Sequence, residues 1–125
     1  MEYRELGHTG WKVSTVGLGT WAMGSAWGPV DDRQSLATLN RALDLGVNFF
    51  DTADVYGSEP LMGRLRRQRQ EPFYIATKMG MGVNPDPRGY TRKNLTLFTE
   101  SSLRSLGVET IDLMQLHCPP IAVYN

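Results

Sequence analysis

The stretch Val47-Asn48-Phe49-Phe50-Asp51 decides the fold. It is a short, mostly apolar run that ends on an acidic residue, which is typical of a buried strand. A helical pattern precedes it, from about Asp32 to a stop at Gly46. Three leucines share one face of that helix: Leu36, Leu39 and Leu43. The strand therefore follows an amphipathic helix with no long linker between them.

The same alternation of strand and helix continues on both sides of this stretch. Residues 16–19 form a short apolar run before the helix. After the strand, Ser58 is placed to cap a second helix that has Pro60 in its first turn. The buried side of that helix is expected to carry Leu61, Met62 and Leu65. Residues 73–78 then form a third strand.

One more helix and one more strand follow. Residues 80–90 are rich in glycine and proline, and a loop of this length indicates a binding or mobile role. Thr91 is expected to cap a third helix, which Gly107 closes. Residues 111–117 form a fourth strand, and two prolines directly after it prevent its continuation.

The chain opens with a hairpin. Turn residues at positions 7–10 separate Leu6 from Trp11, so a β-hairpin is expected over residues 3–13. Strands and helices then alternate, which favours parallel strands joined by right-handed crossovers. The predicted fold class is α/β: an N-terminal β-hairpin followed by half of a (β/α)8 TIM barrel, with strands 1–4 and three helices.

The composition restricts the classes of function. The 125 residues suit one domain, and thirteen basic residues balance thirteen acidic ones, which gives no reason to expect nucleic acid or an anionic membrane as a partner. The start has no apolar secretory signal, and no apolar run reaches the roughly eighteen residues that cross a bilayer. The single cysteine, Cys118, fits a reducing compartment, so a cytoplasmic location is expected. We interpret Cys118 as a small, buried apolar residue at a strand end rather than as a nucleophile.

Ionisable side chains gather at the ends of the predicted strands. Asp51, Lys78 and His117 each end a strand, and Gly19-Thr20 ends the first one. The carboxyl ends of parallel strands lie on one side of a sheet, which in β/α barrels holds the active site. Because side chains alternate between faces, the three ionisable groups are expected to form one layer above a mostly apolar interior. Tyr56 follows Asp51 by five residues, where a loop can fold it over that layer.

This set of residue types suits the reduction of a carbonyl. Singly, each has an ordinary interpretation as a turn residue, a strand end or a core histidine. Together, a buried ammonium lowers the pKa of a phenol, which is otherwise near 10, and a carboxylate offsets the burial of the ammonium. A histidine can hydrogen-bond the substrate oxygen. None of these groups supplies a hydride, so a nicotinamide cofactor is implied, and no metal site is predicted. The head groups of Asp51 and Lys78 are expected about 3 Å apart.

At these residues the chain resembles the aldo-keto reductase family. The resemblance runs from the hairpin to the last residue and rests on five stretches: Val16-Gly17-Leu18-Gly19-Thr20-Trp21, Asn48-Phe49-Phe50-Asp51-Thr52-Ala53, Val55-Tyr56-Gly57, Ile75-Ala76-Thr77-Lys78 and Ile111-Asp112-Leu113-Met114-Gln115-Leu116-His117. It implies a barrel that binds NADPH at the carboxyl ends of its strands. It also implies an oxidoreductase that reduces small aldehydes or ketones to alcohols.

The resemblance carries roles for individual residues. It makes Tyr56 the general acid, Lys78 and Asp51 the groups that tune it, and His117 the group that orients the carbonyl. The residues expected to contact the cofactor are Gly19, Thr20, Trp21 and Asp51. Those expected to contact the substrate are Trp21, Trp27, Tyr56 and His117.

Two features depart from the family's pattern. The link between Tyr56 and Glu59 is shorter than the usual glycine-containing link into the second helix. The chain also stops after its fourth strand, whereas a full barrel has eight strands and about 250 residues. Residues 1–125 are therefore expected to be the N-terminal half of one barrel domain, with most of the NADPH site in the absent half. No G-x-G-x-x-G motif replaces that half, because Gly17-Leu18-Gly19 lacks the third glycine.

Two alternative functions stay open. One makes Lys78 the Schiff-base lysine of a lyase, as in barrel aldolases. The other is a non-catalytic half barrel, truncated or engineered, that self-associates because its strand edges and apolar interior are open. In that case no facing half packs against three inward residues: Phe49, Tyr74 and Leu113.

Overall fold

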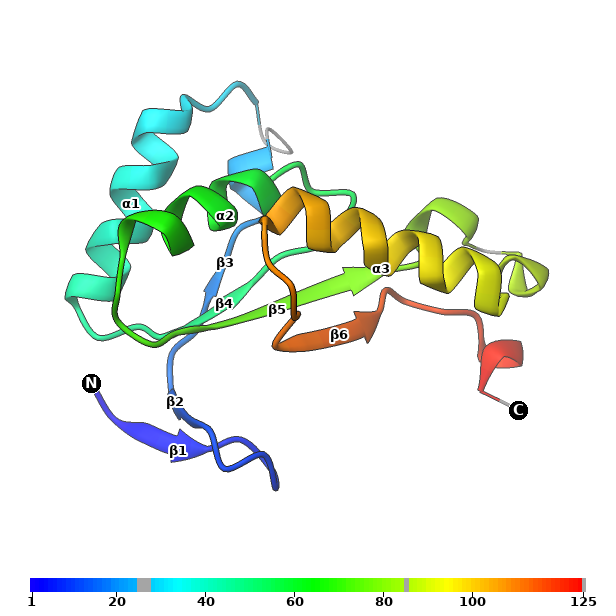
Figure 1. The fold of residues 1–125 in the computed structure, drawn as a ribbon, viewed down its shortest axis with the longest axis horizontal. Helices are drawn as coiled ribbons and strands as arrows, with labels where there is room; N and C mark the ends of the chain where they lie inside the picture. The colour runs from blue at the N-terminus through cyan, green and yellow to red at the C-terminus, as the bar shows by residue number, and fades with distance from the viewer. Residues whose placement is uncertain (25–27, 85, 125) are drawn as a thin grey trace.

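The computed structural model describes residues 1–24, 28–84 and 86–124. A hairpin is followed by alternating strands and helices (Figure 1). In chain order, the strands and α-helices are β1 (Tyr3–Glu5), β2 (Lys12–Ser14), β3 (Leu18–Gly19), α1 (Asp32–Asp44), β4 (Phe49–Asp51), α2 (Glu59–Gln68), β5 (Tyr74–Met79), α3 (Arg92–Leu106) and β6 (Leu113–Leu116). Short 3-10 turns connect them: η1 (Trp21–Gly24), η2 (Met81–Val83), η3 (Pro87–Gly89) and η4 (Ile121–Val123). The predicted order of elements is confirmed.

The second sheet is parallel and runs in chain order. Within the described residues, its four strands lie side by side as β3-β4-β5-β6. Asp51 at the end of β4 lies beside Ala76 in β5, and Lys78 in β5 lies beside Gln115 in β6. The carboxyl ends of neighbouring strands therefore meet at one edge, as the sequence predicted, and the α/β fold class is confirmed.

The helices cover one face of this sheet. Figure 1 shows α1, α2 and α3 on the same side of the strands. Phe50 of β4 points into the layer between sheet and helices, where it is completely buried and meets the edge of Phe73 at 5.5 Å between ring centroids. The buried cluster comprises Leu36, Leu39, Val47, Phe50, Leu61, Met62, Leu65, Phe73, Ile75 and Leu106. Leucines expected on the buried faces of the first two helices therefore do form the core.

Close packing of α2 on α3 depends on a glycine. A Cβ atom at Gly63 would collide with the backbone carbonyl of Leu106. Only glycine therefore lets the two helix backbones approach this closely. The caps of α3 agree with expectation, because the Thr91 side chain accepts from the Asn94 N–H and Gly107 adopts the left-handed conformation, with φ of +64°.

The helix cap expected at Ser58 is wrong. Ser58 does precede α2, but its side chain makes no capping hydrogen bond. Its hydroxyl instead lies 2.8 Å from Thr20 Oγ1 and 2.9 Å from Thr52 Oγ1. The backbone there is already helical, with φ of −96° and ψ of −8°, whereas a capping serine adopts extended backbone and turns its oxygen towards the next N–H groups.

The N-terminal hairpin packs at the amino-terminal ends of β4 and β5, on the side of the sheet opposite the helices. β1 and β2 pair antiparallel. Asn48, just before β4, donates to the carbonyl of Lys12 and accepts from the N–H of Ser14. Trp11 stacks on Tyr74 of β5, with ring centroids 4.7 Å apart. Tyr74 was expected to lack a partner on this face, and the hairpin supplies one.

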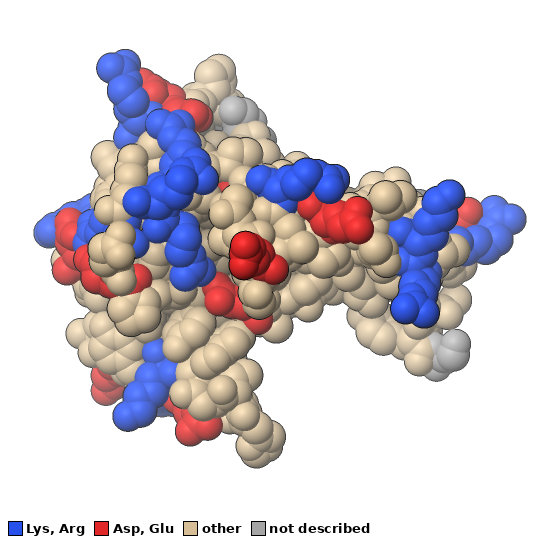
Figure 2. All heavy atoms as spheres, in the orientation of Figure 1, with Lys and Arg blue, Asp and Glu red and all other residues tan. Residues whose placement is uncertain are grey.

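Charged side chains are interspersed over the surface. Figure 2 shows basic and acidic side chains next to one another on the viewed face. Ion pairs join α2 to other segments, with Arg64 2.8 Å from Asp32 of α1 and Arg66 2.7 Å from Asp112 before β6. No helix within the described residues is both long and apolar enough to cross a membrane.

Candidate active site

The carboxyl end of the sheet holds an ion pair between adjacent strands. Lys78 Nζ donates to Asp51 Oδ1 at 2.6 Å and to the backbone carbonyl of Thr52 at 2.8 Å. The side chain of Lys78 is 18% exposed and that of Asp51 is 40% exposed, so the ammonium is the more shielded member. The predicted convergence of Asp51 and Lys78 is confirmed.

Tyr56 lies over this pair. Lys78 Nζ is 5.0 Å from the centroid of the Tyr56 ring. The ring meets the imidazole of His117 edge-on, 5.6 Å away and at 84°. The turn before α1 touches the same loop, because a Cβ atom at Gly24 would collide with the Tyr56 carbonyl. The short link after Tyr56 therefore leaves its ring beside Lys78 and His117.

His117 directly follows β6 and is buried. Its backbone N–H donates to the carbonyl of Met79 at 2.8 Å. Burial lowers the pKa of His117, Lys78 lowers it further, and Asp54 and Asp51 oppose the shift. The imidazole is therefore neutral at neutral pH and offers one N–H donor and one nitrogen acceptor.

Sequence reasoning missed Asp54. Its backbone N–H donates to the Lys78 carbonyl at 3.0 Å, so it lies beside the end of β5. Burial raises the pKa of its carboxyl group, and the backbone N–H groups of Val55 and Gly80 lower it. Asp54 Oδ1 and His117 Nδ1 are both buried without a hydrogen-bond partner in the described part of the chain. The available signal was the second acidic residue in Asp51-Thr52-Ala53-Asp54, which lies beyond the strand and so escaped the strand-end pattern.

A cavity of about 330 Å³ opens beside these groups. Its lining residues are Trp21, Val55, Tyr56, Met81 and His117. The volume suits a small ligand or one end of a larger one. The phenol and the imidazole both reach this space, so a ligand in it would meet the two groups together.

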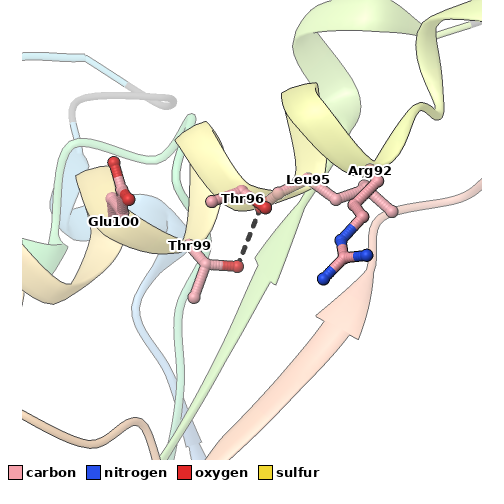
Figure 3. A pocket seen from close by; sticks show the side chains of 5 residues that line it. All are labelled: Arg92, Leu95, Thr96, Thr99 and Glu100. Carbon is pink, nitrogen blue, oxygen red and sulfur yellow. Dashed lines mark hydrogen bonds between the residues drawn. The ribbon is translucent and has the colours of Figure 1, made fainter.

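A second hollow, of about 490 Å³, lies elsewhere. Its lining comes entirely from α3: Arg92, Leu95, Thr96, Thr99 and Glu100 (Figure 3). The Thr99 hydroxyl is engaged with the Leu95 carbonyl of the same helix at 2.9 Å. This hollow is a helix surface rather than a convergence of strand ends, so it is not the candidate site.

The residues expected to contact a cofactor fall into different environments. Trp21 is about half exposed beside the cavity, 6.4 Å from the Tyr56 ring. Thr20 is completely buried, and its hydroxyl donates to the Asp51 carbonyl at 3.0 Å. Trp27, which was expected to contact the substrate, lies outside the described residues.

Cys118, expected to be buried, is exposed and has a positive φ of 48°, because the chain turns sharply there after β6.

The profile of the Aldo/keto reductase family matches residues 15–124. The chain belongs to the aldo/keto reductase family. It is 35% identical over 127 residues to the aldo-keto reductase YhdN of Bacillus subtilis (strain 168), covering 95% of this chain and 38% of that protein. It is 35% identical over 123 residues to the L-galactose dehydrogenase of Arabidopsis thaliana, covering 94% and 38%.

Solved aldo-keto reductases share the fold. The holo form of AKR11C1 from Bacillus halodurans superimposes with a TM-score of 0.76 at 30% identity, over 94% of this chain and 40% of that one. An aldo-keto reductase from Klebsiella pneumoniae in complex with NADPH gives 0.70 at 28% identity, over 85% and 36%. The present chain thus spans about two fifths of the relatives' length, and its hairpin and four parallel strands correspond to the N-terminal half of their barrel.

Proposed function

We propose that this aldo-keto reductase chain provides the proton-donating side of an NADPH-dependent site that reduces aldehydes or ketones to alcohols. The observation that carries the proposal is that the Lys78 ammonium lies 2.6 Å from Asp51 Oδ1 and 5.0 Å from the centroid of the Tyr56 ring. A cation next to a phenol stabilises the phenolate and makes the phenol a better proton donor at neutral pH. Asp51 holds the cation in place.

In this proposal each group acts on a carbonyl that enters the 330 Å³ cavity. Tyr56 gives its proton to the carbonyl oxygen as that oxygen gains negative charge. His117 donates a hydrogen bond to the same oxygen and so fixes the orientation of the carbonyl. Lys78 stabilises the phenolate that remains, and the proton is regained from solvent at the open cavity.

Reduced nicotinamide, when bound, supplies the hydride that the protein side chains lack. The chain offers a surface that fits this ring, because the half-exposed indole of Trp21 lies beside the cavity and Gly19 exposes backbone at the end of β3. The NADPH in the Klebsiella structure supports the same cofactor for this chain. We propose that the remainder of the cofactor binds to further barrel strands. We also propose that the protein is located in the cytoplasm.

The structure gives less support to a Schiff-base role for Lys78. An amine that attacks a carbonyl must lose its proton, which a dry, uncharged or cationic neighbourhood favours. Lys78 Nζ instead donates to a carboxylate and to a backbone carbonyl, and Lys78 is not among the residues that line the cavity. Borohydride with a carbonyl ligand would trap a lysine adduct if that role existed.

The test joins residues 1–125 to the C-terminal remainder of the Bacillus subtilis relative, so that a complete barrel forms. We expect aldehyde-dependent oxidation of NADPH, and Tyr56→Phe should lower kcat by about 10²–10⁴-fold because only the proton donor is removed. Lys78→Met should be similarly severe.

Tyr90→Phe is the matched control, because Tyr90 donates to the Gly80 carbonyl and does not line the cavity. Its rate should stay within about twofold of the unmutated chimera, since a weak neutral hydrogen bond contributes little. A Tyr56→Phe chimera that reduced aldehydes at the unmutated rate would refute the proton-donor role.

A further inference from the structure

Three buried hydroxyl groups lie directly behind the ion pair. Thr20, Thr52 and Ser58 are completely buried, and they come from the segments after β3, after β4 and before α2. Ser58 Oγ is 2.8 Å from Thr20 Oγ1 and 2.9 Å from Thr52 Oγ1. The serine therefore joins two threonines that are 32 residues apart in the sequence.

The direction of these hydrogen bonds is fixed by counting protons. Thr20 donates its hydroxyl proton to the Asp51 carbonyl at 3.0 Å, so it accepts from Ser58. Ser58 has then used its one proton and accepts from Thr52. The chain of donors runs from Thr52 through Ser58 to Thr20 and ends on the carbonyl of Asp51. Such a chain is strengthened because each hydroxyl polarises the next.

The groups at the end of this chain are the ones that hold Lys78. The Asp51 carbonyl also accepts the Thr20 N–H at 2.9 Å, and the Thr52 N–H donates to the Ala76 carbonyl at 2.8 Å. The peptide between Asp51 and Thr52 is thus held on both edges. Lys78 Nζ takes its two acceptors from these same residues, the Asp51 carboxylate and the Thr52 carbonyl.

A serine before a helix normally caps it, and Ser58 does not. Its hydroxyl satisfies none of the free N–H groups of α2, since it makes no capping bond and Pro60 lacks an N–H. Leu61 and Met62 bond to the Ser58 carbonyl, which any residue would provide. The helix therefore does not require this side chain, whereas the two threonines do.

We propose that Ser58 is a positioning residue for Lys78: its hydroxyl holds the Asp51–Thr52 segment in the arrangement that seats the ammonium group. The consequence for catalysis rests on the function proposed above, whereas the seat itself is a property of the folded chain. Without the Ser58 hydroxyl, Thr20 loses its donor and Thr52 loses its acceptor in a buried place. The segment then moves, and both acceptors of Lys78 Nζ move with it.

The test measures exchange of the Lys78 ammonium protons with water by ¹⁵N NMR on the 125-residue chain. Three lysines give three signals, and Lys12 and Lys93 serve as internal references. We expect Ser58→Ala to speed exchange at Lys78 about tenfold relative to those references, because a buried hydrogen-bonding group without its partner destabilises the seat by about 1.4 kcal/mol, the equivalent of tenfold.

Ser102→Ala is the matched control. Ser102 is also a completely buried serine, but its hydroxyl has no partner within the described residues. Its removal should leave exchange at Lys78 unchanged. Thr20→Val provides a second variant if Ser58→Ala does not fold, because it keeps the side-chain shape and deletes the hydroxyl that contacts Asp51. Exchange at Lys78 that is the same in Ser58→Ala, Thr20→Val and Ser102→Ala would overturn the proposal.

A kinetic readout separates positioning from general stability. In the complete-barrel chimera, Ser58→Ala should lower kcat about tenfold with KM within twofold, and Ser102→Ala should change neither. A rise in KM with kcat retained would also overturn the proposal, because Ser58 would then affect substrate binding and not the position of Lys78. If the unmutated chimera reduces no carbonyl, the proposed function fails, while the exchange measurement still decides the role of Ser58.

Discussion

Phe49 and Phe50 are chemically identical neighbours on β4 that serve opposite faces of the sheet. Phe50 is completely buried under the helices and packs edge-on against Phe73. Phe49 is half-buried on the face that the helices do not cover, where its ring lies next to Gly17. Replacing each in turn by alanine measures how much each face of the sheet contributes to the free energy of unfolding.

The expected magnitudes differ by several kcal/mol. Removing a buried phenylalanine ring typically destabilises a core by about 3–5 kcal/mol, through lost transfer energy and the cavity that remains. Domains of this size unfold with about 5–15 kcal/mol, so Phe50→Ala removes a large share. Phe49 keeps part of its ring in water, and its removal should cost about 1 kcal/mol, near the centre of the range for ordinary substitutions.

The assay is urea unfolding followed by far-UV circular dichroism. With a slope of about 2 kcal/mol per molar urea, Phe50→Ala should lower the midpoint by about 2 M and Phe49→Ala by about 0.5 M. Equal slopes for the variants and the unmutated chain would confirm that only stability changed. Equal losses of midpoint would refute the assignment of the two rings to a covered and an uncovered face.

Three further predictions follow from the sheet and its carboxyl end. The uncovered face should drive self-association at micromolar concentration, and Leu113→Glu should shift the chain towards monomer in sedimentation velocity. Because the pKa of His117 lies below its ordinary value of 6.5 in the folded chain, the unfolded chain binds its proton first on acidification. Stability should therefore fall as the pH drops below about 6.5 and level off once the folded chain is also protonated. That part of the pH dependence should be absent from urea midpoints of His117→Asn. Asp112→Ala should destabilise the fold by about 1–3 kcal/mol in urea titrations, because it leaves the Ile75 N–H and the Arg66 guanidinium without their acceptor.

The sequence predicted the ion pair because strands obey a simple period. Asp51 and Lys78 end neighbouring parallel strands, so the alternation of side chains was sufficient to place them on one face. The prediction that Ser58 caps α2 used an equally simple rule and was wrong. A serine before a proline-containing helix has the same local sequence whether or not its side chain caps the helix. Its actual partners, Thr20 and Thr52, are distant in the chain or on another element, and only the packed fold brings them within 3 Å.

The same period of two explains why the supporting hydroxyls lie directly behind the chemistry. Thr20 follows Gly19, Thr52 follows Asp51 and Thr77 precedes Lys78, so each of these strand ends carries a threonine next to its site residue. Neighbouring side chains point to opposite faces, so β4 and β5, which send Asp51 and Lys78 to the open face, send the hydroxyls of Thr52 and Thr77 into the helix-covered layer, and Thr20 after β3 lies in the same layer. There all three threonines are completely buried, and all three are bonded to the start of α2, two through Ser58 and Thr77 through the Glu59 carboxylate at 2.6 Å. A displacement of α2 at its first turn would therefore be transmitted to Asp51 and Lys78 through these hydroxyls, although α2 itself contributes no group to the cavity.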